Sequence, residues 1–131
     1  MPASFPIRTV RLIERYTRSF NYPDAPSVKT KKDLPKYGIK TFFCSNVCAM
    51  YRAENYWRLG GFEKKTIFNE DMIFAGKIIL NGGGIAYVPE ARVIHSHNYG
   101  NIEQLRRNFD LAVSQAEHPE IFTWPAPKAR A

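Results

Sequence analysis

Mostly apolar side chains recur at helical spacing in three stretches of the chain, and these stretches predict three helices. The first covers residues 10–20, with arginines spread between the residues of one face. The second begins after Asn69, a favourable capping residue, and runs to about Leu80. The third runs from about residue 102 to residue 117. The residues that define the three faces are Val10, Ile13, Thr17 and Phe20; Met72, Ile73, Ala75, Ile78 and Ile79; and Leu105, Phe109, Ala112, Val113 and Ala116.

Short runs of apolar and β-branched residues predict three strands, at Lys40–Cys44, Ile85–Val88 and Arg92–His95. A glycine run at residues 82–84 ends the helix before the second strand. It is not a phosphate-binding loop, because it follows a helix instead of opening one and lacks the Lys-Ser/Thr pair of such loops. The pattern as a whole predicts a compact α/β fold.

Proline and glycine indicate where these elements stop. A short helix at Arg52–Leu59 is followed by two glycines, which favour the left-handed conformation that ends helices. Three prolines between residues 23 and 35 interrupt a lysine-rich stretch and predict an irregular connection laid over a surface. We therefore divide the chain into a basic helix and Pro/Lys-rich connection (1–40), an α/β part (41–122) and a frayed tail (123–131).

The composition fits one folded domain. Of 131 residues, 44% are hydrophobic and 14% are aromatic, which is ample for a core. No apolar run approaches the roughly 20 residues that span a bilayer, and the start lacks the apolar stretch of a signal peptide. Two cysteines are too few for a secreted disulfide scaffold, so a reducing, cytoplasmic location fits better.

The positive charge is concentrated near the start of the chain. Residues 1–40 contain nine basic and three acidic residues, a net charge of +6, whereas residues 41–131 have a net charge of +1. Such a segment attracts phosphate, which leaves a binding module for nucleic acid or an anionic membrane as one alternative function. No nucleic-acid-binding motif accompanies it, so we expect no nucleic-acid partner. A solvated basic face is the simpler explanation.

Glu70 and Asp71 lie in the first turn of the predicted helix that follows Asn69. Carboxylates at this position are stabilised by the helix dipole alone, so a purely structural role is the simplest explanation. In the functional interpretation, one carboxylate acts as a general base within hydrogen-bond reach of an acceptor hydroxyl. The helix N-terminus lowers the pKa of a carboxyl group and burial raises it, so the sequence does not decide its base strength.

His95 and His97 alternate along the last predicted strand, so both side chains point to the same face. Two imidazoles on one face can share a metal, or divide between a metal and a substrate. With Cys44 and Cys48 they could also form a Cys2His2 zinc set, which would make the chain a small zinc-stabilised structural domain. The spacing of the cysteines fits such a site poorly, and free cysteines are common in cores.

Several motifs in order carry a family resemblance. They are Phe42-Phe43-Cys44-Ser45-Asn46-Val47-Cys48-Ala49-Met50-Tyr51-Arg52, Leu59-Gly60-Gly61-Phe62, Phe68-Asn69-Glu70-Asp71, Ile85-Ala86-Tyr87-Val88-Pro89 and Ala91-Arg92-Val93-Ile94-His95. Together they resemble the C-terminal half of a family 2 glycosyltransferase, an inverting enzyme of the GT-A fold. The longer stretch from about residue 8 to residue 122, with Arg18-Ser19-Phe20-Asn21-Tyr22-Pro23 and His95-Ser96-His97-Asn98-Tyr99, is similar to bacterial rhamnosyltransferases.

The resemblance implies a role for each matching residue. Asp71 matches the catalytic base, and Glu70 matches its neighbour that positions the acceptor. Beside the resemblance, Ser45 and Asn46 follow the strand predicted at Lys40–Cys44, and residues at the C-terminal end of a strand often contact substrate, so we expect them to bind the acceptor. His95 matches a histidine that joins a divalent metal, Mg²⁺ or Mn²⁺, on the donor diphosphate; His97 is the alternative ligand. The implied reaction transfers a sugar from a nucleotide-sugar donor, with dTDP-rhamnose as a candidate, to a saccharide acceptor in polysaccharide biosynthesis.

The N-terminal, nucleotide-binding half of such an enzyme has no counterpart in the sequence. The implied fold is therefore half of a GT-A domain, a short mixed sheet with flanking helices. No Asp-x-Asp metal motif occurs, since the aspartates are Asp24, Asp33, Asp71 and Asp110. We predict that the chain alone does not bind a nucleotide sugar productively. The expected location is the cytoplasm, with the inner face of the membrane as a candidate site of action.

Overall fold

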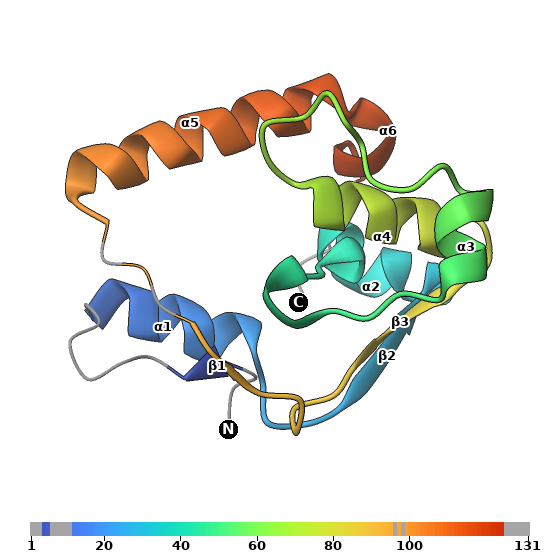
Figure 1. Ribbon diagram of the computed structural model, residues 1–131, viewed down its shortest axis with the longest axis horizontal. Coiled ribbons are helices and arrows are strands. Elements are labelled where there is room, and N and C mark those ends of the chain that lie inside the picture. Colours follow the sequence, from blue (N-terminus) through green and yellow to red (C-terminus); the bar gives the residue numbers. More distant parts are fainter. Residues whose placement is uncertain (1–3, 6–11, 96, 98, 125–131) are drawn as a thin grey trace.

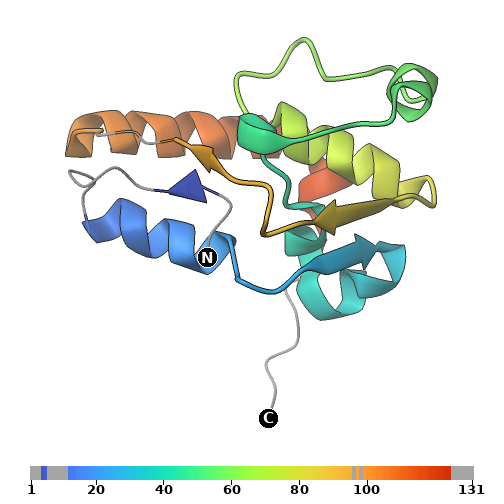
Figure 2. The same cartoon turned by 60° about the horizontal axis from the view of Figure 1, so that its bottom comes forward.

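The computed structural model describes residues 4–5, 12–95, 97 and 99–124. Strands β1 (Ser4–Phe5) and β4 (Val93–Ile94) pair in parallel, and strands β2 (Ser27–Thr30) and β3 (Gly84–Tyr87) pair antiparallel. Helices flank both pairs (Figures 1 and 2). The predicted α/β class is confirmed, although two separate two-stranded sheets stand where one short mixed sheet was expected.

The described residues also form six α-helices. They are α1 (Leu12–Asn21), α2 (Leu34–Tyr37), α3 (Ala53–Arg58), α4 (Glu70–Leu80), α5 (Asn101–Glu117) and α6 (Pro119–Phe122). The four helices expected from the sequence correspond to α1, α3, α4 and α5, while Val10 at the start of the first lies outside the described residues. Within the described residues, no helix is long and apolar enough to cross a membrane.

Helix α4 is the centre of the fold. Its Ile73 and Ile79 side chains are fully buried, as its broad apolar face predicts, and so is Phe74, which lies outside that predicted face. Ile79 belongs to a core cluster with Leu34 of α2, Phe42 and Ile121 of α6, and Trp124 packs against the same cluster. The remainder of the predicted frayed tail, residues 125–131, lies outside the described residues.

An aromatic cluster attaches α3 and the following loop to α4. Tyr51, Tyr56, Phe62 and Phe74 pack edge to face, and the centroids of the Tyr51 and Phe62 rings are 5.4 Å apart. Such ring pairs stabilise a fold beyond their burial alone. Gly61 lies directly beneath the Tyr56 ring, with a positive φ of 68°. The predicted glycine stop after α3 is therefore also a close-packing point.

The strand predicted at Lys40–Cys44 is wrong. Residues Gly38–Phe42 form a 3₁₀ helix instead, and the Phe43 N–H donates to the Lys40 carbonyl at 3.2 Å. Thr41 and Phe42 are neighbours in sequence and both fully buried, whereas a strand would turn them to opposite faces. An apolar run this short does not distinguish strand from helix by periodicity.

The irregular connection predicted before residue 40 is also partly regular. It contains β2, a 3₁₀ turn at Lys31–Asp33 and α2, and Pro35 lies in the first turn of α2, where proline is tolerated. Asp33 closes the turn by accepting hydrogen bonds from the Thr30 N–H at 2.8 Å and hydroxyl at 3.1 Å. The partner of β2 is β3, far along the chain, and a lysine-rich segment gives no local sign of that pairing.

Candidate active site

Glu70 and Asp71 open helix α4, as the sequence predicts. Asn69 precedes them in the left-handed conformation, with φ of 66°, and is largely buried. Its side-chain amide donates to the Leu111 carbonyl of α5 at 3.4 Å, so Asn69 supports the helix start through α5 rather than by a side-chain cap. The two carboxylates therefore project from a helix end that α5 holds in place.

The structure brings Asn46 to these carboxylates, with Ser45 next to it in the same turn. The Asn46 backbone N–H donates to Asp71 Oδ2 at 3.2 Å, and its side-chain amide donates to Glu70 Oε1 at 3.2 Å. Ser45 begins the same turn and accepts from the Val47 N–H at 3.4 Å. Asn46 thus bridges the carboxylates of Glu70 and Asp71, and Ser45 adjoins this cluster as the neighbour of Asn46 in the chain.

Tyr51 completes this cluster and was not predicted as a site residue. Its hydroxyl donates to Asn46 Oδ1 at 2.8 Å, which fixes the Asn46 amide so that its NH₂ group faces Glu70. The same hydroxyl lies 3.6 Å from the Cys44 sulfur. Burial raises the pKa of Tyr51 well above its ordinary value, so the phenol remains a neutral donor. The sequence presents Tyr51 as an ordinary core aromatic, so this role was missed although Tyr51 is only five residues from Asn46.

Burial raises the pKa of Asp71 above its ordinary value, even though two N–H groups favour its ionised form. Those donors are Asn46 and Met72, whose backbone N–H reaches Asp71 Oδ1 at 2.8 Å. A carboxylate with a raised pKa binds a proton more strongly than an exposed one. This property suits a general base better than the helix N-terminus alone would allow.

The raised pKa of Asp71 predicts a specific pH dependence of stability. The native state holds the Asp71 proton more tightly than the unfolded chain, so this stability is present below about pH 4 and is lost as pH rises through the native pKa. We expect Asp71→Asn to remove that fall. Urea unfolding of both proteins at intervals from pH 3.5 to 7 measures this effect. The free energy of unfolding of the variant, relative to that of the wild type, should increase as the pH rises.

Glu63 provides the matched control for this measurement. Its carboxylate accepts the N–H groups of Lys65 and Lys64, which lower its pKa, so its contribution has the opposite sign and is lost as pH falls. Glu63→Gln should therefore weaken the fold towards neutral pH. A difference between wild type and Asp71→Asn that does not change with pH would contradict the assignment of a raised pKa to Asp71.

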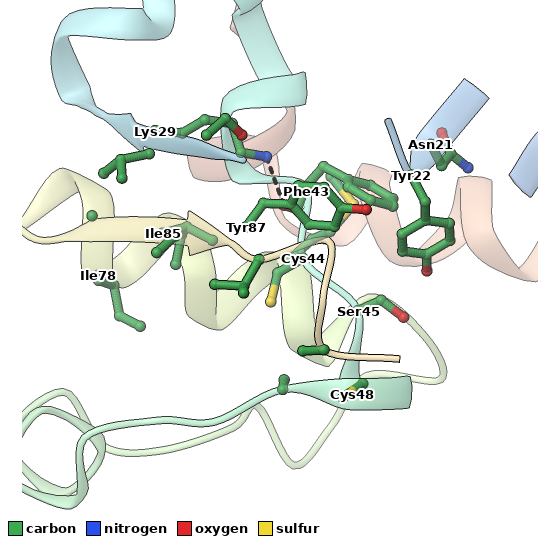
Figure 3. Close-up of a pocket in the computed structure, with 18 of the residues that line it drawn as sticks. Asn21, Tyr22, Lys29, Phe43, Cys44, Ser45, Cys48, Ile78, Ile85 and Tyr87 are labelled. Atoms are coloured by element: carbon green, nitrogen blue, oxygen red, sulfur yellow. Dashed lines mark hydrogen bonds between the residues drawn. The ribbon is translucent and has the colours of Figure 1, made fainter. Parts of the chain in front are cut away.

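A large cavity of about 1300 Å³ lies beside this cluster. Lys29, Cys44, Ser45 and Tyr87 are among its lining residues, contributed by β2, β3 and the turn after residue 43 (Figure 3). Lys29 Nζ donates to the Phe43 carbonyl at 2.8 Å. Asp71, Glu70 and Asn46 do not line the cavity, but Tyr51 does, and its hydrogen bond to Asn46 connects the two.

His95 and His97 meet just beyond β4. Their ring centroids are 4.4 Å apart, and His97 stacks on Tyr99 at 4.9 Å. Arg107 of α5 lies over Tyr99 at 4.5 Å and over Phe68 at 4.8 Å, which joins the histidine pair to the residues just before Glu70. Ser96 and Asn98, between and beside the two histidines in the sequence, lie outside the described residues.

The histidine pair has the donor atoms for a metal, but the described part of the chain adds no further ligand. Nowhere in that part do three or more His, Cys, Asp or Glu side chains converge on one point. The Cys2His2 zinc set is therefore not assembled, and both cysteines are free. Two imidazoles suit Mn²⁺ better than Mg²⁺, which prefers oxygen, and either ion would need oxygen ligands from elsewhere.

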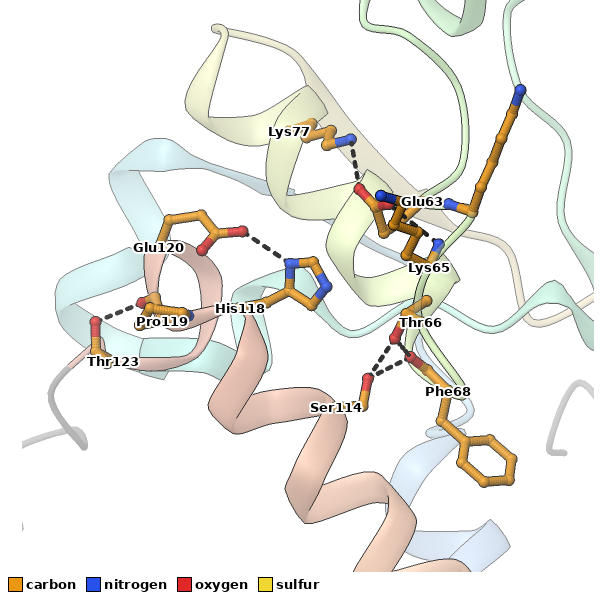
Figure 4. Close-up of polar contacts among 11 residues, drawn as sticks. Glu63, Lys65, Thr66, Phe68, Lys77, Ser114, His118, Pro119, Glu120 and Thr123 are labelled. Carbon is orange, nitrogen blue, oxygen red and sulfur yellow. Dashed lines mark hydrogen bonds and ion pairs between the residues drawn. The ribbon is translucent and has the colours of Figure 1, made fainter.

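The loop before α4 is held by α5 (Figure 4). The hydroxyls of Thr66 and Ser114 lie 2.6 Å apart, and each donates to the Phe68 carbonyl at 2.5 Å. Ser114 is almost fully buried. These contacts among Thr66, Ser114 and the Phe68 carbonyl fix the backbone just before the two carboxylates. The sequence alone did not indicate them.

The basic-module alternative finds no support in the described residues. Lys29 is partly buried, burial lowers its pKa, and its ammonium donates to the carbonyls of Phe43 and Lys40. Arg18 is buried as well. Arg8 and Arg11 lie outside the described residues. At least two of the cations in segment 1–40 therefore belong to the fold rather than to a free basic surface.

Comparison with known proteins gives relatives among bacterial rhamnosyltransferases, a class of glycosyltransferase. The chain is 46% identical over 106 residues to the O-antigen chain rhamnosyltransferase RfbN of Salmonella typhimurium. It is 44% identical over 106 residues to the O-antigen chain rhamnosyltransferase WbaN of Salmonella anatum. Both matches cover 81% of this chain and 34% of the relative, so the chain spans about a third of the length of these curated relatives.

No protein-family model matches the chain, and no solved structure matches it. The matched segment is nevertheless homologous to part of the O-antigen chain rhamnosyltransferases, which confirms the similarity to bacterial rhamnosyltransferases seen in the sequence.

Proposed function

We propose that this chain forms the acceptor side of a rhamnosyltransferase that transfers rhamnose, with inversion, from a nucleotide-sugar donor to a saccharide acceptor. One observation carries the proposal. Within a segment 46% identical to a rhamnosyltransferase, Asn46 donates hydrogen bonds to both carboxylates, Glu70 and Asp71, at a helix N-terminus. The candidate donor is dTDP-rhamnose, and the GT-A fold of family 2 is part of the proposal.

Asp71 is the proposed general base. It takes the proton from an acceptor hydroxyl as that oxygen attacks the anomeric carbon, while the bond from that carbon to the diphosphate oxygen breaks on the opposite face. The raised pKa of the half-buried carboxyl supports this assignment, because it increases the affinity of the carboxylate for a proton.

The neighbouring residues position this base and the acceptor. Glu70 and Ser45 are proposed to border the acceptor hydroxyl. Asn46 acts beside them by holding both carboxylates, and Tyr51 fixes the orientation of the Asn46 amide. The cavity lined by Tyr22, Phe43 and Tyr87 has aromatic faces and ample volume for sugar rings, so it is the proposed acceptor path.

His95 and His97 are proposed to contribute a ligand to Mg²⁺ or Mn²⁺ in the complete enzyme, where diphosphate oxygens of the donor would supply further ligands. The ion would stabilise the negative charge that develops on the leaving diphosphate. The proximity of the two imidazoles, and their link through Tyr99 and Arg107 to Phe68, support this placement.

A segment exchange tests the proposal. The 106 matched residues of this chain replace their counterparts in RfbN of Salmonella typhimurium, and rhamnosyl transfer from dTDP-rhamnose is measured. We expect the chimera to transfer rhamnose and the purified 131-residue chain to transfer none. A chimera that folds and binds the donor but transfers no sugar would overturn the proposed function. Transfer by the chain alone would overturn the prediction that it requires the remaining part.

A further inference from the structure

Helix α5 carries an apolar stripe that faces away from the core. Ile102, Leu105 and Phe109 are 67%, 69% and 69% exposed, and Ala112 and Ala116 are exposed as well. Their spacing alternates between three and four residues, the repeat by which helices pack along an apolar seam. We call these five residues the α5 stripe. Helices of folded proteins normally bury such a face.

The orientation of α5 is fixed from its other side. Ser114 is the single buried side chain of the helix, and it binds the loop before α4. Arg107 packs on Tyr99 and Phe68. In both overall views, α5 runs from α6 and α4 at its C-terminal end out to a projecting N-terminal half (Figures 1 and 2). A small rotation of α5 therefore cannot hide the stripe without breaking these contacts.

The charges beside the stripe argue against an anionic membrane as its partner. Helix α5 contains three acidic residues and two arginines, and one of the arginines, Arg107, is engaged by aromatic rings. Membrane-binding amphipathic helices are instead rich in free basic residues on their polar face. An apolar protein surface is the partner that a near-neutral helix with a packing seam fits best.

The length of the relatives suggests which protein surface is the partner of the α5 stripe. The segment shared with this chain makes up 34% of RfbN, so about two thirds of that protein lies outside it. We propose that the α5 stripe is the surface that packs against this other part of a rhamnosyltransferase. The stripe would then join the acceptor side to the rest of the enzyme while Ser114, on the buried side of the same helix, holds the loop that leads to Glu70 and Asp71. The proposal rests on the similarity to rhamnosyltransferases and not on the sugar-transfer chemistry.

Charged substitutions in two contexts test this interface. Leu105→Asp and Phe109→Asp are made in the 131-residue chain and in the RfbN chimera, and thermal unfolding is measured for each. In the chain alone the stripe is solvated, so we expect the melting temperature to change by less than about 3 °C. In the chimera we expect a fall of roughly 5–10 °C, because the new charge would be buried.

Ile67→Asp is the matched control, since Ile67 is 64% exposed and lies outside the stripe. It should have the same small effect in both proteins. Equal effects of the stripe variants in both proteins would overturn the proposal. So would dimers of the chain, or binding of vesicles containing anionic lipid, that Leu105→Asp abolishes. A chimera that is stable, sensitive at the stripe and unable to transfer sugar would sink the proposed function but leave this interface standing.

Discussion

Asp71→Asn in the RfbN chimera is expected to lower kcat for rhamnosyl transfer by about 10³-fold, within the 10²–10⁴-fold that general-base catalysis contributes. This loss corresponds to about 4 kcal/mol of transition-state stabilisation. The variant keeps the shape of the side chain but only one acceptor oxygen, which can serve either the Asn46 N–H or the Met72 N–H, and it cannot take a proton. Donor KM should change little, because the base acts on the acceptor hydroxyl.

Asp110→Asn is the control for the loss of a carboxylate as such, since Asp110 lies on α5, apart from the Asn46 cluster. Its kcat should stay within about twofold of the parent chimera, as expected for a surface change away from the chemistry. A loss of less than tenfold in Asp71→Asn, with the fold intact, would mean that another group accepts the proton. Glu70 would then be the first residue to test, because Asn46 holds it beside Asp71.

The position of Asp71 at a helix start could be predicted from the sequence because the signals for that helix are local. Asn69 with Glu70 and Asp71 marks a helix start, and the apolar residues after them follow one helical face, so α4 begins and ends where expected. The contact of Asn46 with these carboxylates had no local signal. The sequence placed Ser45 and Asn46 near the substrate because they follow a predicted strand, but that segment is a 3₁₀ helix, and only the structure shows Asn46 in contact with Glu70 and Asp71.

The remaining parts of the site depend on contacts that no periodicity encodes. Tyr51 positions Asn46, five residues before it, and Arg107 joins Tyr99 to Phe68, which is far away in the sequence. For the α5 stripe, the sequence predicts the helix but not the environment of its apolar face. Leu105 and Phe109 correctly predict an amphipathic helix, but the pattern alone does not reveal that this face stays exposed in the chain.

The glycines after α3 allow a similarly sharp test of stability. Both Gly60 and Gly61 have positive φ, 79° and 68°, so alanine at either position pays the cost of a left-handed conformation, about 1–2 kcal/mol. A Cβ on Gly60 would meet no atom within 4 Å, whereas a Cβ on Gly61 would lie 2.8 Å from Cζ of the Tyr56 ring. We therefore expect Gly61→Ala to lower the free energy of unfolding by a further 1–3 kcal/mol, roughly the cost of overpacking a core.

Urea unfolding of the two alanine variants measures this difference, with Gly60→Ala as the matched control for backbone strain. A second background isolates the ring contact, because Tyr56→Ala removes the atoms that the new Cβ would meet. In that background the two glycine substitutions should cost the same, so the coupling between positions 56 and 61 should equal the extra penalty. Equal costs of Gly60→Ala and Gly61→Ala with Tyr56 present would contradict the close packing of this turn. The aromatic cluster that attaches α3 to α4 would then be looser than the ring distances indicate.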